Sequence, residues 1–379
     1  MEKKNSRRGF LKKATVVTSG SVLAATAAFT LKSENKTEKN IELMPVIKSI
    51  KPLGFQWETQ DPFLFCVHHE DAYPKGNENQ GPSASLAGRN IGQDFLLKDG
   101  WRMYHGDKVP GFPGHPHRGF ETITVVREGM VDHTDSMGAS GRYGDGDVQW
   151  MTSGKGVQHA EMFPLVKETE DNPMELFQIW LNLPKKNKFV EPHFKMLWAE
   201  SIPVFEHSDE FGKVKVEVIA GQIGDLKAPS PPPNSWASPS ENDVAVWNIK
   251  MDEGAKWTLP KAKSGVNRTV YFYKGDELKI EGETLAHYHS ADVESENDIT
   301  IESGSEECHI LILQGKPINE PVVQHGPFVM NTKEEIRQAF VDYQNTQFGG
   351  WPWKESGPVH PREKGRFAAH ADGTIEDKS

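Results

Sequence analysis

Residues 111–122 read GFPGHPHRGFET, and residues 154–164 read GKGVQHAEMFP. Each stretch carries two side chains that can bind a metal, spaced two positions apart: His115 and His117 in the first, His159 and Glu161 in the second. Side chains on an extended strand alternate between its two faces, so residues two apart point the same way. We therefore expect each pair to lie on a strand and to face one direction.

The sequence between these stretches predicts strands joined by tight turns. Residues 122–126 read TITVV, which is β-branched throughout, while residues 135–138 (DSMG) and 144–147 (GDGD) are rich in turn-forming residues. Such a meander can fold the two stretches onto each other inside a small barrel. The alternative is that the four side chains are ordinary polar strand residues that face solvent.

Three imidazoles and one carboxylate suit a divalent transition metal. Fe(II) is the ion we expect, with Ni, Cu, Co, Mn or Zn as alternatives. The lack of cysteine in the set argues against a structural zinc site, which usually includes thiolates. Isolated histidines are expected to be solvated or satisfied by hydrogen bonds; these are His68, His69, His133, His193, His325, His360 and His370.

Three segments resemble the pirin family, whose members are bicupins of the cupin superfamily. They are residues 115–122 (HPHRGFET), residues 146–162 (GDVQWMTSGKGVQHAEM) and residues 326–336 (GPFVMNTKEEI). The resemblance implies an all-β fold of two cupin (RmlC-like) β-barrels in tandem, followed by a short C-terminal helix. It also implies that His115, His117, His159 and Glu161 hold the metal, whereas Glu121, at the position where many cupins place a carboxylate ligand, does not.

The resemblance further implies an oxidoreductase that acts on quercetin or a similar flavonol. The reaction would be a 2,3-dioxygenation with ring opening, the partners would be a small phenolic substrate and O₂, and Glu161 would be the catalytic base. Two alternatives stay open. One is a non-catalytic, metal-bound redox sensor or protein-binding cupin, and the other is a cupin isomerase or hydrolase.

The N-terminus has the features of an export signal. Residues 6–13 read SRRGFLKK, which closely matches the twin-arginine pattern, and a mildly apolar segment follows at residues 14–29. Residues 25–27 (ATA) offer a small-x-small cleavage site. We expect a periplasmic protein that reaches the twin-arginine export machinery already folded, with an uncleaved anchor as the minor alternative.

Charge excludes several kinds of partner. The chain has a formal net charge of −11, and removal of residues 1–27, which carry six Lys or Arg and one Glu, would make it more acidic still. Such a protein has no electrostatic basis for binding nucleic acid or anionic lipid. We therefore expect neither nucleic acid nor, after signal cleavage, a membrane as partner, and we expect a monomer.

The chain is expected to divide into five parts. These are the signal peptide (1–27), a flexible tether (28–43), a metal-binding N-terminal cupin domain (44–187), a C-terminal cupin domain without metal (188–330), and a C-terminal helix with its tail (331–379). The helix should begin near Thr332, with Glu335 completing a capping box, and the tail should be irregular. Cys66 and Cys308 are expected to be buried free thiols, although one disulfide between them is formally allowed.

Overall fold

The computed structural model describes residues 46–378, and the predicted signal and most of the tether lie outside this range. The described chain is mainly β, with one α-helix near its C-terminus, and its strands form two barrels of two sheets each. The expected all-β bicupin fold is therefore confirmed. No helix within residues 46–378 has the length and apolar character needed to span a lipid bilayer.

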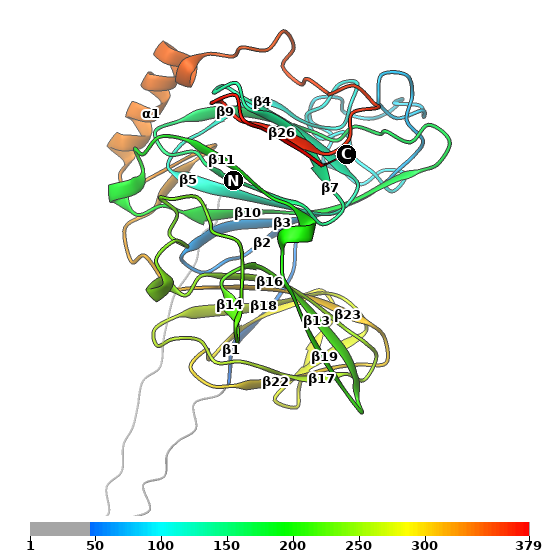
Figure 1. Ribbon diagram of the computed structural model, residues 1–379, viewed down its shortest axis with the longest axis vertical. Helices are drawn as coiled ribbons and strands as arrows, with labels where there is room; N and C mark the ends of the chain where they lie inside the picture. The colour runs from blue at the N-terminus through cyan, green and yellow to red at the C-terminus, as the bar shows by residue number, and fades with distance from the viewer. Residues whose placement is uncertain (1–45, 379) are drawn as a thin grey trace, which may run out of the picture. The chain divides into compact units, whose positions relative to one another are not determined.

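The first barrel is built from two six-stranded antiparallel sheets. In spatial order, one contains β11 (His193–Leu197), β8 (Val148–Thr152), β5 (Phe120–Glu128), β10 (Asn172–Asn182), β3 (Phe63–Tyr73) and β2 (Gln56–Trp57). The other contains β27 (Ile375–Asp377), β26 (Phe367–Ala369), β7 (Ser140–Gly144), β6 (Met130–Asp135), β9 (Val157–Met162) and β4 (Gly111–His117). Figure 1 shows the two sheets as stacked layers, with β4, β9 and β26 above β10 and β3.

The second barrel has a seven-stranded and a four-stranded sheet. The larger contains β1 (Ile47–Pro52), β21 (His289–Val293), β18 (Asn267–Lys274), β23 (Cys308–Gly315), β16 (Ala245–Met251), β13 (Gly212–Ala220) and β12 (Val204–Asp209). The smaller contains β17 (Lys256–Leu259), β22 (Ile299–Ser303), β19 (Glu277–Ile280) and β20 (Glu283–Ala286).

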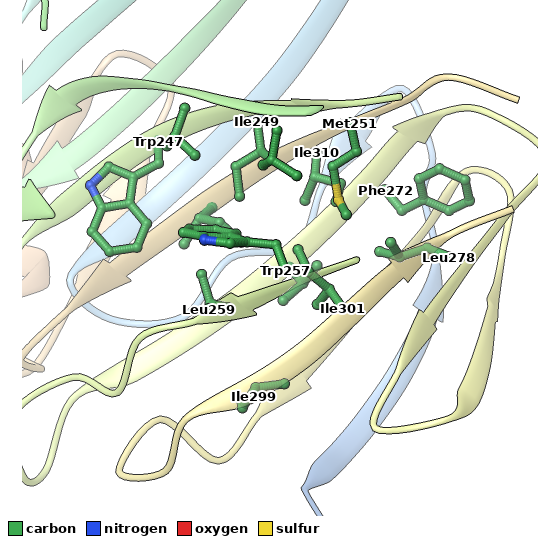
Figure 2. Packing of buried hydrophobic residues seen from close by; sticks show 14 of the residues in the cluster. Trp247, Ile249, Met251, Trp257, Leu259, Phe272, Leu278, Ile299, Ile301 and Ile310 are labelled. Carbon is green, nitrogen blue, oxygen red and sulfur yellow. The ribbon is translucent and has the colours of Figure 1, made fainter. Parts of the chain in front are cut away.

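Strand alternation builds the core of the second barrel. Trp247, Ile249 and Met251 lie at alternate positions of β16, and all three side chains are buried. Figure 2 shows them packed with Trp257 and Ile301 from the smaller sheet. The two sheets therefore enclose a continuous apolar interior that holds this barrel together.

A second apolar cluster joins the two barrels. It includes Trp57 and Phe177 from the first barrel and Tyr271 and Tyr273 from the second. Trp57 stacks on Tyr271 with a ring separation of 5.2 Å and an interplanar angle of 15°. Aromatic pairs of this kind stabilise an interface by more than the burial of their surface area alone would provide.

Several strands pair outside the domain limits expected from the sequence. β1 lies within the limits expected for the first domain, but it pairs with β21 in the second barrel. β11 lies within the limits expected for the second domain, but it pairs with β8 in the first barrel. The C-terminal tail is not irregular throughout, because β26 pairs with β7 and β27 pairs with β26. These pairings depend on distant partners, so local sequence patterns do not reveal them.

The remaining elements are short. The helix α1 (Lys333–Thr346) begins after Thr332, whose side chain accepts a hydrogen bond from the backbone N–H of Glu335, and the predicted capping box is confirmed. Cys66 and Cys308 are both buried and unpaired. Residues 46–378 also contain two small hairpins and four 3₁₀ turns: β14 (Gln222–Ile223) with β15 (Leu226–Lys227), β24 (Val323–His325) with β25 (Phe328–Met330), η1 (Lys185–Asn187), η2 (Ala199–Ser201), η3 (Ser240–Asn242) and η4 (Gln347–Gly349).

Candidate metal centre

Strands β4 and β9 bring the two predicted ligand pairs together. They are antiparallel neighbours, and His115 lies directly opposite His159. The register shifts between Phe112 and His115, which marks a β-bulge, a local device that re-aims side chains. The alternation expected from the sequence thus operates here, with a bulge that the sequence did not reveal.

Three imidazoles form a compact group. His115, His117 and His159 each offer one ring nitrogen, and these atoms lie within 4.8 Å of one another. Their ring centroids are 4.5 to 4.9 Å apart. His159 is completely inaccessible to solvent and His117 is nearly so. Within residues 46–378 no other cluster of three or more such side chains has this geometry.

The protonation state of these three rings suits the binding of a cation. Burial lowers the pKa of His115 to about 4 and holds the pKa values of His117 and His159 well below their usual range, so all three rings are neutral. A neutral imidazole is the form that binds metals. Both nitrogens of His159 and Nδ1 of His117 are buried without a hydrogen-bond partner in the described chain. Such orphaned nitrogens are costly in a protein interior, and a bound divalent ion would satisfy one on each ring.

Glu161 lies beside this group. Its Oε2 is 3.6 Å from Nε2 of His159. The hydroxyl of Thr124 lies 2.9 Å from Oε1 of Glu161 and 2.6 Å from Oε1 of Gln178, so two acceptors share its one proton, and the amide of Gln178 donates to Oε2 of Glu161 over 3.0 Å. Because Thr124 and Gln178 belong to β5 and β10, the sheet opposite β9 orients this carboxylate.

Glu121 lies in a different environment. It is fully buried and accepts hydrogen bonds from Thr152 over 2.6 Å and from Ser235 of the second domain over 2.5 Å. Burial raises the pKa of Glu121 to about 7. His287 and His289, the H-x-H pair of the second barrel, are not part of any group of three or more potential ligands within residues 46–378.

His115, His117 and Glu161 border a cavity of about 560 Å³ in the first barrel, and His159 lies behind them, outside the cavity lining. Its lining is mostly aromatic and apolar. The lining residues are Phe55, Phe65, Val67, His69, Phe95, His105, Phe112, Pro113, Gly114, His115, His117, Thr124, Glu161, Phe163, Leu176, Gln178, Trp180 and Pro327. A cavity of this size and character is typical of small-molecule sites.

The segment between β3 and β4 closes one side of this cavity. Phe95 and His105 from this segment line the cavity, and Tyr104 packs behind them with its side chain completely buried. Trp150 and Met151 of β8 are buried core residues and do not line the cavity. Sequence reasoning did not identify Thr124 or Gln178, because nothing in their local pattern distinguishes them from other polar strand residues.

Comparison with known proteins places the chain in a family. Residues 51–181 match the family model described as Pirin, and residues 246–349 match that of the Pirin C-terminal cupin domain. A Pseudomonas aeruginosa protein with the provisional name quercetin 2,3-dioxygenase is 37% identical over 255 residues, which cover 66% of this chain and 85% of that protein. Human Pirin is 35% identical over 265 residues, which cover 67% of this chain and 82% of the human protein.

Solved structures agree with this assignment. The crystal structure of quercetin 2,3-dioxygenase from Acinetobacter baumannii is similar with a TM-score of 0.63 and 27% identity, covering 80% of this chain and 98% of that one. The same family is indicated by the matches to both pirin domain models, by the histidine group and by the relatives. The chain belongs to the pirin family.

Proposed function

We propose that this protein is a metal-dependent dioxygenase of quercetin or related flavonols, which opens the central ring with incorporation of both atoms of O₂ and release of carbon monoxide. The observation that carries the proposal is the group of three histidines, of which His115 and His117 line an aromatic cavity together with Glu161. Support also comes from the quercetin 2,3-dioxygenase names of the Pseudomonas and Acinetobacter proteins.

His115, His117, His159 and Glu161 are the residues that would hold the ion, with Fe(II) the ion we expect and Ni, Cu, Co, Mn or Zn as alternatives. When bound, the ion supplies Lewis-acid activation of the flavonol 3-hydroxyl and of O₂. A set of four protein ligands would leave coordination positions open for a substrate, as a catalytic site requires.

Glu161 is the group best placed to hold the substrate proton. Its carboxylate borders the cavity, and it is oriented by a hydrogen bond from Gln178 to Oε2 and by contact of the Thr124 hydroxyl with Oε1. A carboxylate held in this way can accept the proton of the flavonol 3-hydroxyl at either Oε1 or Oε2 without reorientation.

The aromatic walls account for the class of substrate. Phe112, Phe163 and Trp180 line the cavity, and flat polyphenols gain most from contact with rings of this kind. The same side chains keep bulk water from the reacting carbons, which limits loss of the activated substrate to side reactions.

Export through the twin-arginine pathway is part of the proposal. Residues 6–13 (SRRGFLKK) support it, and they lie outside the residues that the structure describes. Replacement of Arg7 and Arg8 by Lys should retain the protein in the cytoplasm, as judged by fractionation of cells that express the full chain. Periplasmic accumulation of that variant at the wild-type level would contradict export by this route.

Oxygen uptake tests the activity directly. Protein expressed without residues 1–27 is loaded separately with each candidate metal, its metal content is measured, and O₂ consumption and carbon monoxide release are followed after quercetin is added. Uptake should be equimolar with quercetin lost. If no metal form consumes O₂ although the ion is demonstrably bound, the dioxygenase proposal is wrong, and the non-catalytic role and the isomerase or hydrolase role remain.

The second barrel supplies a control for the metal site. His289→Ala alters an H-x-H pair outside the site and should keep both metal and activity, whereas His115→Ala should lose both. Equal metal loss in the two variants would place the ion elsewhere.

A further inference from the structure

A hydrogen-bonded network of four residues ends at the cavity wall, and none of the four is a candidate metal ligand. His69 and Asp71 lie two positions apart on β3, while Arg102 and Tyr104 belong to the segment between β3 and β4. Nδ1 of His69 is 2.8 Å from the hydroxyl of Tyr104, which donates a 2.5 Å hydrogen bond to Oδ2 of Asp71. Arg102 donates to the other oxygen of Asp71 over 3.1 Å.

This hydrogen-bond network determines which atoms carry the protons. Burial raises the pKa of Asp71 to about 6, although Tyr104 and Arg102 favour its carboxylate form, so at pH 7 and above Asp71 is ionised and the single proton of Tyr104 is committed to it. The Tyr104 oxygen can then only accept from His69, which places the imidazole proton on Nδ1. Burial lowers the pKa of His69 to about 3, so the ring carries one proton and Nε2 is a hydrogen-bond acceptor.

This acceptor is available to a ligand. His69 lines the cavity, and its ring is held edge-on by Phe112 at 6.0 Å and by Phe55 at 5.9 Å. Within residues 46–378, Nε2 makes no hydrogen bond, and it is not among the fully buried unpaired atoms. A fixed acceptor on an otherwise aromatic wall is the kind of group that selects ligands by one donor.

We infer that His69 is a specificity-determining residue of the cavity, whose Nε2 accepts a hydrogen bond from a ring hydroxyl of a polyhydroxylated aromatic ligand. Tyr104, Asp71 and Arg102 are positioning residues that hold the ring in the accepting tautomer. This inference deepens the proposed function, because it assumes a flavonol-type ligand with its 3-hydroxyl near Glu161. It adds the requirement for a second hydroxyl, distant from the first.

Anaerobic binding measures this requirement without turnover. Calorimetry with the nickel-loaded protein compares quercetin with 3-hydroxyflavone, which keeps the 3-hydroxyl and lacks all the others. Quercetin should bind about tenfold more tightly to the wild type, the effect of one well-placed hydrogen bond. In His69→Phe this advantage should fall below about twofold, whereas metal content should not change.

Tyr104→Phe tests the positioning chain and retains the aromatic ring. Nitrogen-15 NMR of histidine-labelled protein should show His69 protonated at Nδ1 in the wild type and at Nε2 in this variant, with a several-fold loss of the quercetin advantage. Tyr73→Phe is the matched control. It removes another buried tyrosine hydroxyl, which bonds to the backbone carbonyl of Arg102, and should alter neither result.

The outcomes separate this inference from the proposed function. A retained quercetin advantage in folded His69→Phe, or a wild-type His69 protonated at Nε2, would overturn the role of His69. Intact binding preferences with no O₂ uptake would overturn the dioxygenase and leave this inference standing. Failure of both flavonols to bind the metal-loaded wild type would overturn both.

Discussion

The side-chain amide of Gln178 donates a 3.0 Å hydrogen bond to Oε2 of Glu161, and the two residues come from opposite sheets of the first barrel. The carboxylate predicted to bind the ion is thus held from across the barrel interior. Partners of this kind orient a ligand before the metal arrives, and their loss typically weakens metal binding 10- to 100-fold.

Replacement of Gln178 by Met should weaken metal binding by about tenfold. Methionine fills a similar volume but cannot donate to Glu161, so the carboxylate gains freedom that it must lose when the ion binds. Competition with a chelating dye measures the dissociation constant of nickel. Gln222→Met, at an exposed position outside the site, is the control. Wild-type affinity in Gln178→Met would show that this hydrogen bond does not prepare the site.

Replacement of Glu161 by Gln should abolish oxygen uptake and spare the fold. The amide retains an oxygen that can accept from Thr124 or Gln178, but it cannot take a proton from a flavonol hydroxyl. Circular dichroism and the thermal midpoint of the metal-free protein should match those of the wild type. Turnover within tenfold of the wild type would remove Glu161 from the role of base.

Stability should depend on pH through Glu121. Burial raises the pKa of this carboxyl from 4.5 to about 7, so the folded state binds the proton more tightly than the unfolded chain. The contribution of Glu121 to the free energy of unfolding is therefore fully present below pH 4.5 and is lost as pH rises through 7. The total is roughly 3 kcal/mol. Urea unfolding at pH 5 and pH 8 measures the change.

The variant Glu121→Gln cannot ionise, so its stability relative to the wild type should increase between pH 5 and pH 8. Glu283→Gln, at an exposed position on β20, should parallel the wild type at both pH values. A parallel response from Glu121→Gln would show that Glu121 does not titrate in this range.

Replacement of Thr332 by Ala should destabilise α1 by about 1 kcal/mol, because the backbone N–H of Glu335 loses its acceptor. Thr332→Ser retains the hydroxyl and should restore most of the loss. Proteolysis of the folded protein at α1 is a sensitive readout of this local stability. Equal protease resistance in the Ala and Ser variants would contradict a role for the cap.

The sequence predicts that the three histidines lie close together because the information for this is local. His115 with His117, and His159 with Glu161, are paired by strand alternation alone. The helix cap at Thr332 is equally local, since a capping box spans only four residues.

Features that depend on long-range pairing were not predictable. Thr124 and Gln178 face Glu161 only because β5 and β10 close the barrel opposite β9. The role of His69 depends on its contact with Tyr104, which the segment between β3 and β4 supplies, and its local sequence does not distinguish it from other isolated histidines. The pairing of β1 with β21 has the same origin, because the register of distant strands follows from packing.

A crystal structure of the protein grown with its metal, with data collected at the absorption edge of that metal, tests the central claim most directly. The account predicts one anomalous peak in the first barrel, within about 2.3 Å of His115, His117, His159 and Glu161. A peak outside this barrel, or fully loaded protein whose four side chains point away from the ion, would contradict it.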